Sequence, residues 1–294
     1  MQKAIITDQV HEDLEKACQI ICDDGYKYIE LHNVFGKTIE ACNDEEVQQI
    51  KKIVERYQLQ VCNIASTVFF LCPLYPHYKV SLFNPAFYTI EGDVKTHLQY
   101  LHRACKAAQE LQCPTVRIFP FRFPDNEDVV VVGTDADIKE ISKHLRKAAD
   151  IAQSYDRTLV LENCPYSHLP KGEMTFKVVQ QVNHKHLQLL WDPANSYRAE
   201  KHKVPQAYLQ CDLHQEYDLI QQAIGHVHIK NYHYDPSYQK PFLHTNVVAG
   251  DIDYMELFTL MKPSYQGVLS LEPEVDHKQT IVSMEQLTKI LAQI

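Results

Sequence analysis

The feature of the sequence that most constrains its fold is a regular alternation of short apolar runs with amphipathic stretches. Each amphipathic stretch spaces its apolar residues as one face of a helix does, whereas the short apolar runs are typical of buried strands. Eight such runs occur, at residues 4–7, 28–31, 60–65, 115–119, 158–162, 187–192, 224–230 and 268–272. Strands that alternate with helices in this way form parallel sheets, because each helix carries the chain back to the starting edge.

Eight strand–helix units, each of about 35 residues in a chain of 294 residues, predict a closed α/β barrel of the (β/α)₈ type. We expect it to form one domain over residues 1–294. A doubly wound open sheet is the alternative, and the regular repeat without a break in composition favours closure. Helices are predicted from near His11 to Gly25, after a capping box at Asn43 and Glu46, and over residues 94–111, 138–152, 175–182, 213–223, 252–261 and 284–291.

Composition and charge narrow the classes of function. The formal net charge of −9 disfavours binding to nucleic acids or to anionic membranes, both of which require a basic surface. The chain has no apolar run of the roughly 18 residues that a membrane span needs, and its opening does not resemble a signal peptide. Nine cysteines without a C-x-x-C pair are typical of reduced thiols. We therefore expect a cytoplasmic protein without membrane or nucleic-acid partners.

The last four predicted strands each end in a side chain that can bind a metal ion. These residues are Glu162 in "LVLEN", Asp192 in "LLWDPAN", His228 in "HVHIKN" and Glu272 in "LSLEPE". In a closed barrel the ends of neighbouring strands meet at one mouth, so the four should converge. Three carboxylates held close together repel one another, and a divalent cation removes that conflict. Oxygen ligands with one imidazole suit Mn²⁺ best, then Mg²⁺ or Co²⁺, with Zn²⁺ also compatible.

Each of these residues also has a more ordinary interpretation. An acidic residue after a strand often caps the next helix, and a lone histidine is more often part of the core. The matching positions on four consecutive strands favour the common site. On the seventh strand alternate residues share a face, so Lys230 should lie nearer the mouth, where it can meet a substrate oxygen. His226 should lie deeper, as a core residue or a support for the site.

Five segments resemble the sugar phosphate isomerase/epimerase family, whose fold is the xylose isomerase-like TIM barrel: "LVLEN", "LLWDPANSY", "GHVHIKN", "AGDIDY" and "LSLEPE". The resemblance starts at "GYKYIEL" and covers nearly the whole chain. It implies one metal ion bound by Glu162, Asp192, His228 and Glu272. It also implies that Glu162 and Glu272 are catalytic. One would remove the proton beside a carbonyl group, and the other would return it to the opposite face of a metal-stabilised cis-enediolate.

Two further residues are candidates for substrate binding. Asn195 stands where many members of the family have histidine, and its amide can bind a hydroxyl group but cannot titrate near neutral pH. Arg117 interrupts the apolar strand "TVRIF". It either binds an anionic group of the substrate or pairs with a carboxylate such as Glu30. The loop over residues 68–92, rich in Tyr, Phe and Pro, is expected to act as a lid over the mouth.

Four functions compete on these observations. A metal-dependent isomerase or epimerase of a ketose, a polyol-derived ketone or a small hydroxy-carbonyl compound is favoured. A dehydratase could use the same enediolate to eliminate water. A phosphodiesterase related to endonuclease IV is disfavoured by the acidic charge and by Asn195. A sugar-binding protein without activity is disfavoured by the complete set of four ligands. The substrate, the phosphorylation of the sugar and homo-oligomer formation are left open by the sequence.

Overall fold

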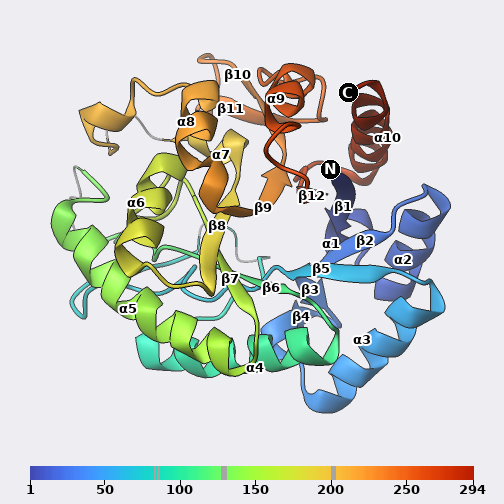
Figure 1. Ribbon diagram of the computed structural model, residues 1–294, viewed down its shortest axis with the longest axis horizontal. Helices are drawn as coiled ribbons and strands as arrows, with labels where there is room; N and C mark the ends of the chain where they lie inside the picture. The colour runs from blue at the N-terminus through green and yellow to red at the C-terminus, as the bar shows by residue number, and fades with distance from the viewer. Residues whose placement is uncertain (83, 85–86, 127–130, 200–202) are drawn as a thin grey trace.

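The computed structural model describes residues 1–294 except 83, 85–86, 127–130 and 200–202 (Figure 1). Eight parallel strands close into a barrel in the order β1-β12-β9-β8-β7-β6-β5-β2. The strands are β1 (Gln2–Ile6), β2 (Tyr28–Leu31), β5 (Gln60–Ile64), β6 (Thr115–Ile118), β7 (Thr158–Glu162), β8 (Leu187–Trp191), β9 (Ile224–Ile229) and β12 (Val268–Leu271). The predicted (β/α)₈ barrel is confirmed, and each of the eight predicted apolar runs forms one of these strands.

Helices surround the barrel on the outside (Figure 1). They are α2 (Leu14–Asp23), α3 (Asp44–Arg56), α4 (Val94–Glu110), α5 (Asp135–Ser154), α6 (Gly172–Val182), α8 (Leu213–Ile220), α9 (Tyr254–Met261) and α10 (His277–Gln293). The capping box of Asn43 and Glu46 is present at the start of α3. Helix α10 begins earlier than predicted because Asp276 caps a first turn that is polar, and a polar turn carries no apolar periodicity. Among the described residues, the helices are too short or too polar to cross a membrane.

Several short elements escaped prediction. They are α1 (Thr7–Val10), α7 (Pro193–Arg198), the hairpins β3 (Asn33–Val34)–β4 (Lys37–Thr38) and β10 (Asn231–Tyr234)–β11 (Phe242–Thr245), and the 3₁₀ turns η1 (Ile39–Ala41), η2 (Gln206–Tyr208) and η3 (Gln221–Ala223). The turn of the first hairpin shows why. Phe35 and Gly36 both have positive φ, 56° and 72°, as a two-residue hairpin turn requires. Phenylalanine is uncommon in that conformation, so "VFGK" does not signal a turn.

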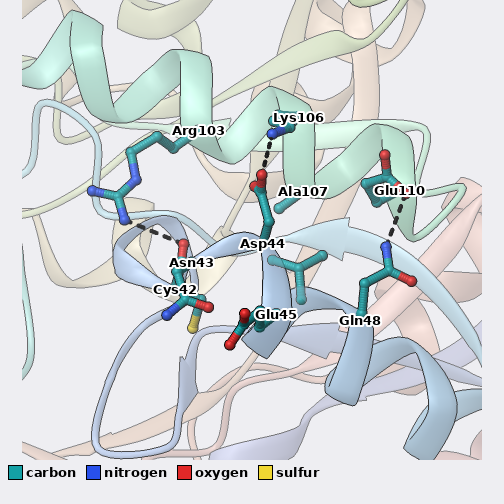
Figure 2. Close-up of a pocket in the computed structure, with 10 residues that line it drawn as sticks. Cys42, Asn43, Asp44, Glu45, Gln48, Arg103, Lys106, Ala107 and Glu110 are labelled. Carbon is teal, nitrogen blue, oxygen red and sulfur yellow. Dashed lines mark hydrogen bonds and ion pairs between the residues drawn. The ribbon is translucent and has the colours of Figure 1, made fainter.

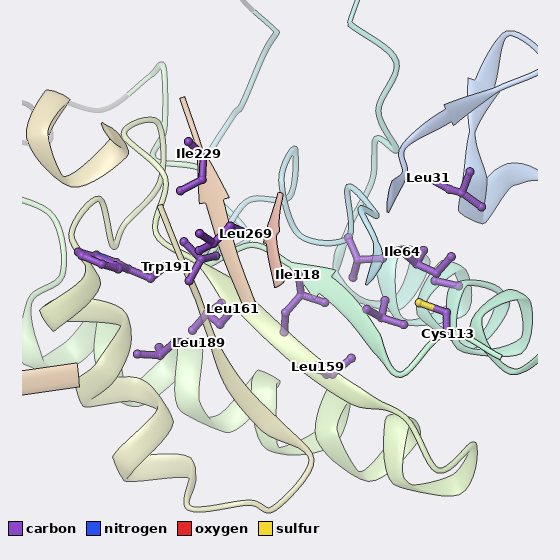
Figure 3. Packing of buried hydrophobic residues seen from close by; sticks show 14 of the residues in the cluster. Leu31, Ile64, Cys113, Ile118, Leu159, Leu161, Leu189, Trp191, Ile229 and Leu269 are labelled. Carbon is purple, nitrogen blue, oxygen red and sulfur yellow. The ribbon is translucent and has the colours of Figure 1, made fainter. Parts of the chain in front are cut away.

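The strands bury apolar side chains on their outer face and polar ones inside the barrel. Leu159, Leu161, Leu189 and Trp191 belong to the hydrophobic cluster between the strands and the helices (Figure 3). The intervening residues of several strands are polar and buried, namely Glu30, Arg117, Glu162, His226, His228 and Ser270. Because strand residues alternate between the two faces, these polar side chains point into the barrel. The outer layer therefore supplies most of the apolar burial, and the axis of the barrel is polar.

The long loop after β5 is tied to the fold at both ends. Glu40 accepts hydrogen bonds of 2.7 Å from the backbone N and from Oγ1 of Thr67, and Thr67 Oγ1 accepts a 3.1 Å bond from the backbone N of Ile90. Within the loop, the ring of Phe70 packs against Phe119 at the end of β6. The described part of the loop therefore lies at the mouth. Residues 83 and 85–86 of the expected lid lie outside the described residues, and its closing motion stays a prediction.

His97 on α4 fixes the same loop and gives the protein a pH dependence. Its Nδ1 accepts a 2.9 Å hydrogen bond from the backbone N of Phe69, and its Nε2 lies 3.3 Å from the carbonyl oxygen of Leu71. Burial lowers the pKa of His97 from 6.5 to about 4. The folded protein thus holds the neutral imidazole, whereas the unfolded chain takes up the proton at a higher pH.

We expect this histidine to destabilise the fold in acid. Above pH 6.5 the imidazole is neutral in both states and has no effect. As the pH falls from 6.5 to about 4, proton uptake by the unfolded chain lowers the free energy of unfolding by about 3 kcal/mol. Urea unfolding between pH 7.5 and 4 would measure it, with His97→Gln as the comparison, because glutamine keeps a donor and an acceptor but does not titrate. The wild-type protein should lose stability relative to the variant over this range. Parallel pH profiles would contradict the assignment.

Candidate active site

The four residues predicted as metal ligands lie together at the mouth of the barrel. Glu162 ends β7, Asp192 follows β8, His228 lies in β9, and Glu272 follows β12. These four strands are neighbours in the barrel. One ligand atom from each residue lies within 4.8 Å of the others, and all but Glu272 are fully buried. The expected convergence is therefore present, while the role of these residues as ligands stays a prediction.

Asp192 caps a helix with one carboxylate oxygen and presents the other to the candidate site. Its Oδ1 accepts a 2.8 Å hydrogen bond from the backbone N of Asn195 and so caps α7, which has Pro193 in its first turn. Its Oδ2 faces the site and lies 3.0 Å from Lys230 Nζ. The pKa of Asp192 is raised to about 6, because burial and the nearby carboxylates of Glu162 and Glu272 outweigh the opposite effect of Lys230. One oxygen is committed to the helix, and the other is available to a ligand.

Lys230 lies among carboxylates. Its Nζ donates hydrogen bonds of 2.9 Å to Glu272 Oε2 and of 3.0 Å to Glu274 Oε1, in addition to its contact with Asp192. Burial raises the pKa of Glu272, but Lys230, His228 and Arg117 outweigh it and hold that pKa well below its usual value. The expected position of Lys230 near the mouth is found, and in this state its ammonium group is engaged by protein carboxylates.

Arg117 enters the barrel and bridges two of the acidic residues. Its Nη1 donates 3.1 Å hydrogen bonds to Glu162 Oε2 and to Glu272 Oε1, while Nη2 and Nε bind the carbonyl oxygens of Ala65 and Ser66. Arg117 therefore pairs with carboxylates, one of its two expected roles, but these are Glu162 and Glu272 rather than the suggested Glu30. Arg117 and Lys230 already neutralise part of the acidic charge. Carboxylate repulsion alone is therefore a weaker reason for a metal ion than the sequence indicated.

Asn195 also contacts the site. The first turn of α7 places its Nδ2 3.2 Å from Glu162 Oε1 and 2.9 Å from the carbonyl oxygen of Asn163. Glu162 thus has one oxygen on Asn195 and the other on Arg117. The amide holds the carboxylate in place in this structure, and its expected contact with a substrate hydroxyl stays a prediction.

The best support for a metal ion comes from His228. Its Nε2 is hydrogen-bonded to Glu30 Oε2 at 3.1 Å, so its Nδ1 faces the other carboxylates. Nδ1 lies 3.4 Å from Glu272 Oε2 and 3.7 Å from Glu162 Oε1, and forms no hydrogen bond within the described part of the chain. Burial lowers the pKa of His228, but Glu30, Glu272 and Glu162 raise it well above its usual value. A buried nitrogen facing several carboxylate oxygens fits a divalent cation with oxygen and nitrogen ligands.

Sequence reasoning did not assign Glu30 to the site. Its carboxylate binds His228 through Oε2 and His226 through Oε1. His226 thus contacts the carboxylate that also binds His228, and it lies deeper in the barrel, as expected. The signal was present in "YIEL", where an acidic residue occupies an inward position of an otherwise apolar strand. Without knowledge of which strands face each other across the barrel, its histidine partners could not be assigned.

Comparison with known families decides the affiliation of this chain. The sequence profile of the family described as xylose isomerase-like TIM barrel matches residues 18–292. The chain belongs to this family. The suspected resemblance is therefore confirmed at the level of the superfamily. No individually curated protein matches the chain at a significant level.

Solved structures of the xylose isomerase-like TIM barrel type share the fold over the whole chain. The apo 3-keto-D-glucoside 4-epimerase YcjR from E. coli has a TM-score of 0.69 and 15% identity, covering 99% of each chain. The probable 3-DHS dehydratase AsbF from Bacillus anthracis has a TM-score of 0.69 and 14% identity, covering 98% of this chain and 99% of that one. The IOLI protein with a binding zinc atom has a TM-score of 0.69 and 14% identity, covering 100% and 99%.

Two cavities of this xylose isomerase-like barrel lie away from the mouth. One, of about 760 Å³, lies between α3 and α4 and is lined by groups that pair with each other, such as Lys106 with Asp44 (Figure 2). The other, of about 560 Å³, is lined by Tyr28, Gln60 and Val268 at the starts of their strands, and reaches His226. Barrel enzymes keep their chemistry at the ends of the strands. The convergence of Glu162, Asp192, His228 and Glu272, rather than cavity size, therefore identifies the candidate site.

Proposed function

We propose that the protein is a divalent-metal-dependent isomerase or epimerase of a small carbohydrate or hydroxy-carbonyl compound. The observation that carries the proposal is the pair of carboxylates, Glu162 and Glu272, that lie 3.7 Å and 3.4 Å from the buried Nδ1 of His228. Membership of the xylose isomerase-like family supports it, as does the likeness to an epimerase. The substrate is expected to be a ketose, a polyol-derived ketone or a small hydroxy-carbonyl compound.

The placement of the two glutamates supports a two-base proton transfer. Strands β8 and β9 separate β7 from β12 in the barrel, so Glu162 and Glu272 approach the space beside His228 from different sides. Arg117 donates a hydrogen bond to one oxygen of each and so holds the two carboxylates in fixed positions. One ionised carboxylate can remove the proton beside a carbonyl group, and the protonated partner can deliver a proton to the opposite face.

The metal ion would be held by Glu162, Asp192, His228 Nδ1 and Glu272. When bound, it would polarise the substrate carbonyl and so acidify the adjacent C–H bond. The donor set favours Mn²⁺, with Mg²⁺, Co²⁺ and Zn²⁺ as alternatives. Asn195 and Lys230 would orient substrate hydroxyl groups, and Arg117 would hold the two glutamates.

A dehydratase is the second candidate, and the position of Lys230 favours it. The Lys230 ammonium group can donate a hydrogen bond to a hydroxyl group on the β-carbon, while the glutamate that removed the proton beside the carbonyl protonates that hydroxyl group as it leaves as water. The first step would be the same proton removal by a glutamate. The likeness to a probable 3-DHS dehydratase is consistent with this reaction class.

One experiment separates these candidates. Ketoses, aldoses, inososes and 3-dehydroshikimate would be incubated with the Mn²⁺-loaded protein in D₂O and followed by proton NMR. We expect an isomerised or epimerised product that carries deuterium at the reacting carbon, because a proton held on a carboxylate exchanges with solvent. Loss of water from the product would instead establish the dehydratase. Turnover without deuterium would indicate a hydride shift, and absence of turnover across the panel would favour a binding protein.

A further inference from the structure

A chain of polar contacts crosses the inside of the barrel beneath the candidate metal site. Glu30 on β2 contacts His226 and His228 on β9, although β1 and β12 lie between these two strands in the barrel. The contact therefore spans the interior. All three side chains are at least 97% buried, so water does not compete for these hydrogen bonds.

The carboxylate of Glu30 is held from a third direction. Asn63 Nδ2 donates a 3.1 Å hydrogen bond to Glu30 Oε2, and Asn63 Oδ1 accepts a 2.9 Å bond from Thr115 Oγ1. Thr115 Oγ1 also lies 2.9 Å from the carbonyl oxygen of Cys62. Glu30 is thus positioned by groups on β5 and β6 as well as on β9. Such a set of contacts leaves the carboxylate little freedom to turn.

We propose that Glu30 is a positioning residue for the metal site. By accepting the Nε2–H of His228, it holds the imidazole with Nδ1 facing the space between Glu162, Asp192 and Glu272. His226 occupies the other oxygen of Glu30 and stops the carboxylate from rotating away. This inference rests on the metal site of the proposed function. Partners of this kind typically change metal affinity by about 10- to 100-fold when they are removed.

A second metal ion is the competing interpretation of the same residues. Donor atoms of Glu30, His226 and His228 lie within 4.8 Å of one another. However, both histidines contact the carboxylate directly, so the present arrangement pairs the groups with each other. We therefore assign hydrogen bonds to this cluster, and metal stoichiometry distinguishes the two interpretations.

The first test is metal binding by Glu30→Gln, measured by calorimetry with Mn²⁺ and with Zn²⁺. Glutamine has the same shape, but it places an amide NH₂ against one of the two histidines. We expect one metal ion per chain in the wild-type protein and a dissociation constant raised about 10- to 100-fold in the variant. Glu40→Gln is the matched control, because Glu40 is equally buried but binds Thr67 instead of a histidine. Its dissociation constant should match that of the wild-type protein.

The second test reads the orientation of the ring itself and does not require a variant. In protein loaded with ¹¹³Cd²⁺ and labelled with ¹⁵N-histidine, Nδ1 of His228 should couple to cadmium while Nε2 keeps its proton. His226→Asn keeps Glu30 but removes the imidazole that binds its Oε1. This variant should bind metal more weakly than the wild-type protein. It provides the mutational test if Glu30→Gln does not fold.

The outcomes are distinct. Coupling of cadmium to Nε2, two metal ions per chain, or equal affinity of the wild-type protein and Glu30→Gln would overturn the positioning role while leaving the proposed function intact. A wild-type protein that binds neither Mn²⁺ nor Zn²⁺ would overturn the proposed function itself.

Discussion

Glu162→Gln and Glu272→Gln are each expected to lower turnover by about 10²- to 10⁴-fold at saturating metal, the usual effect of losing a general base. Both replacements keep the size of the side chain and one carbonyl oxygen. Neither amide can accept a proton from carbon. At Glu162, moreover, Arg117 and Asn195 each donate to one carboxylate oxygen, so an amide NH₂ must face one of these donors. Steady-state rates on the substrate found by the NMR screen would measure the effect.

Asp192→Asn is the informative comparison. Asp192 caps α7 through Oδ1 and offers only Oδ2 to the site. Loss of the negative charge in Asp192→Asn should therefore weaken metal binding more than it alters proton transfer. Excess Mn²⁺ should restore much of the activity of this variant and little of that of the glutamine variants. If both glutamine variants turn over normally at saturating metal, the two glutamates act only as ligands and the two-base mechanism is wrong.

Arg117→Met should destabilise the metal-free protein by about 3–5 kcal/mol, because it leaves two carboxylates in the site without their shared donor. Methionine preserves much of the length of the side chain and removes its charge. A bound divalent cation would replace that charge. The loss of stability should therefore be much smaller in the Mn²⁺-loaded protein. Urea unfolding with and without Mn²⁺ measures both values.

Arg103→Met provides the matched control for this change. Arg103 is an exposed residue of α4 whose Nη2 binds the carbonyl oxygens of Ala41 and Cys42, and it lies among the groups of the outer cavity (Figure 2). Its replacement should cost less than about 1 kcal/mol, with or without Mn²⁺. An equal loss for Arg117→Met in the two metal states would show that the arginine has a structural role independent of the metal site.

The barrel was predictable from sequence because its determinants are local. Each strand is a short apolar run, and each long helix shows its own periodicity and cap, as Asn43 and Glu46 do for α3. Helix α7 was missed because "PANSYR" spans only six residues and has no apolar face. The hairpin β10–β11 was missed because each of its strands has only four residues and neither strand is a continuous apolar run.

The site was predictable only where its residues share one position on consecutive strands. Glu162, Asp192, His228 and Glu272 do so, and they converge. Contacts across the barrel interior join strands that are not consecutive, so the sequence pattern does not reveal them. Glu30 reaches β9 from β2, and Arg117 on β6 reaches Glu272 beyond β12, so the partner of each depends on the width and tilt of the closed barrel. For that reason the sequence predicted a carboxylate partner for Arg117 but did not identify Glu162 and Glu272.

The order of the strands has a consequence for biosynthesis. Glu272 follows β12, which pairs with β1 on one side and with β9 on the other and so completes the ring. During translation, Glu162, Asp192 and His228 emerge first, and Glu272, the fourth predicted ligand, reaches them only when β12 has docked. A nascent or misfolded chain therefore lacks the assembled site. Under the proposed function, binding of the metal ion by all four residues would require a closed barrel.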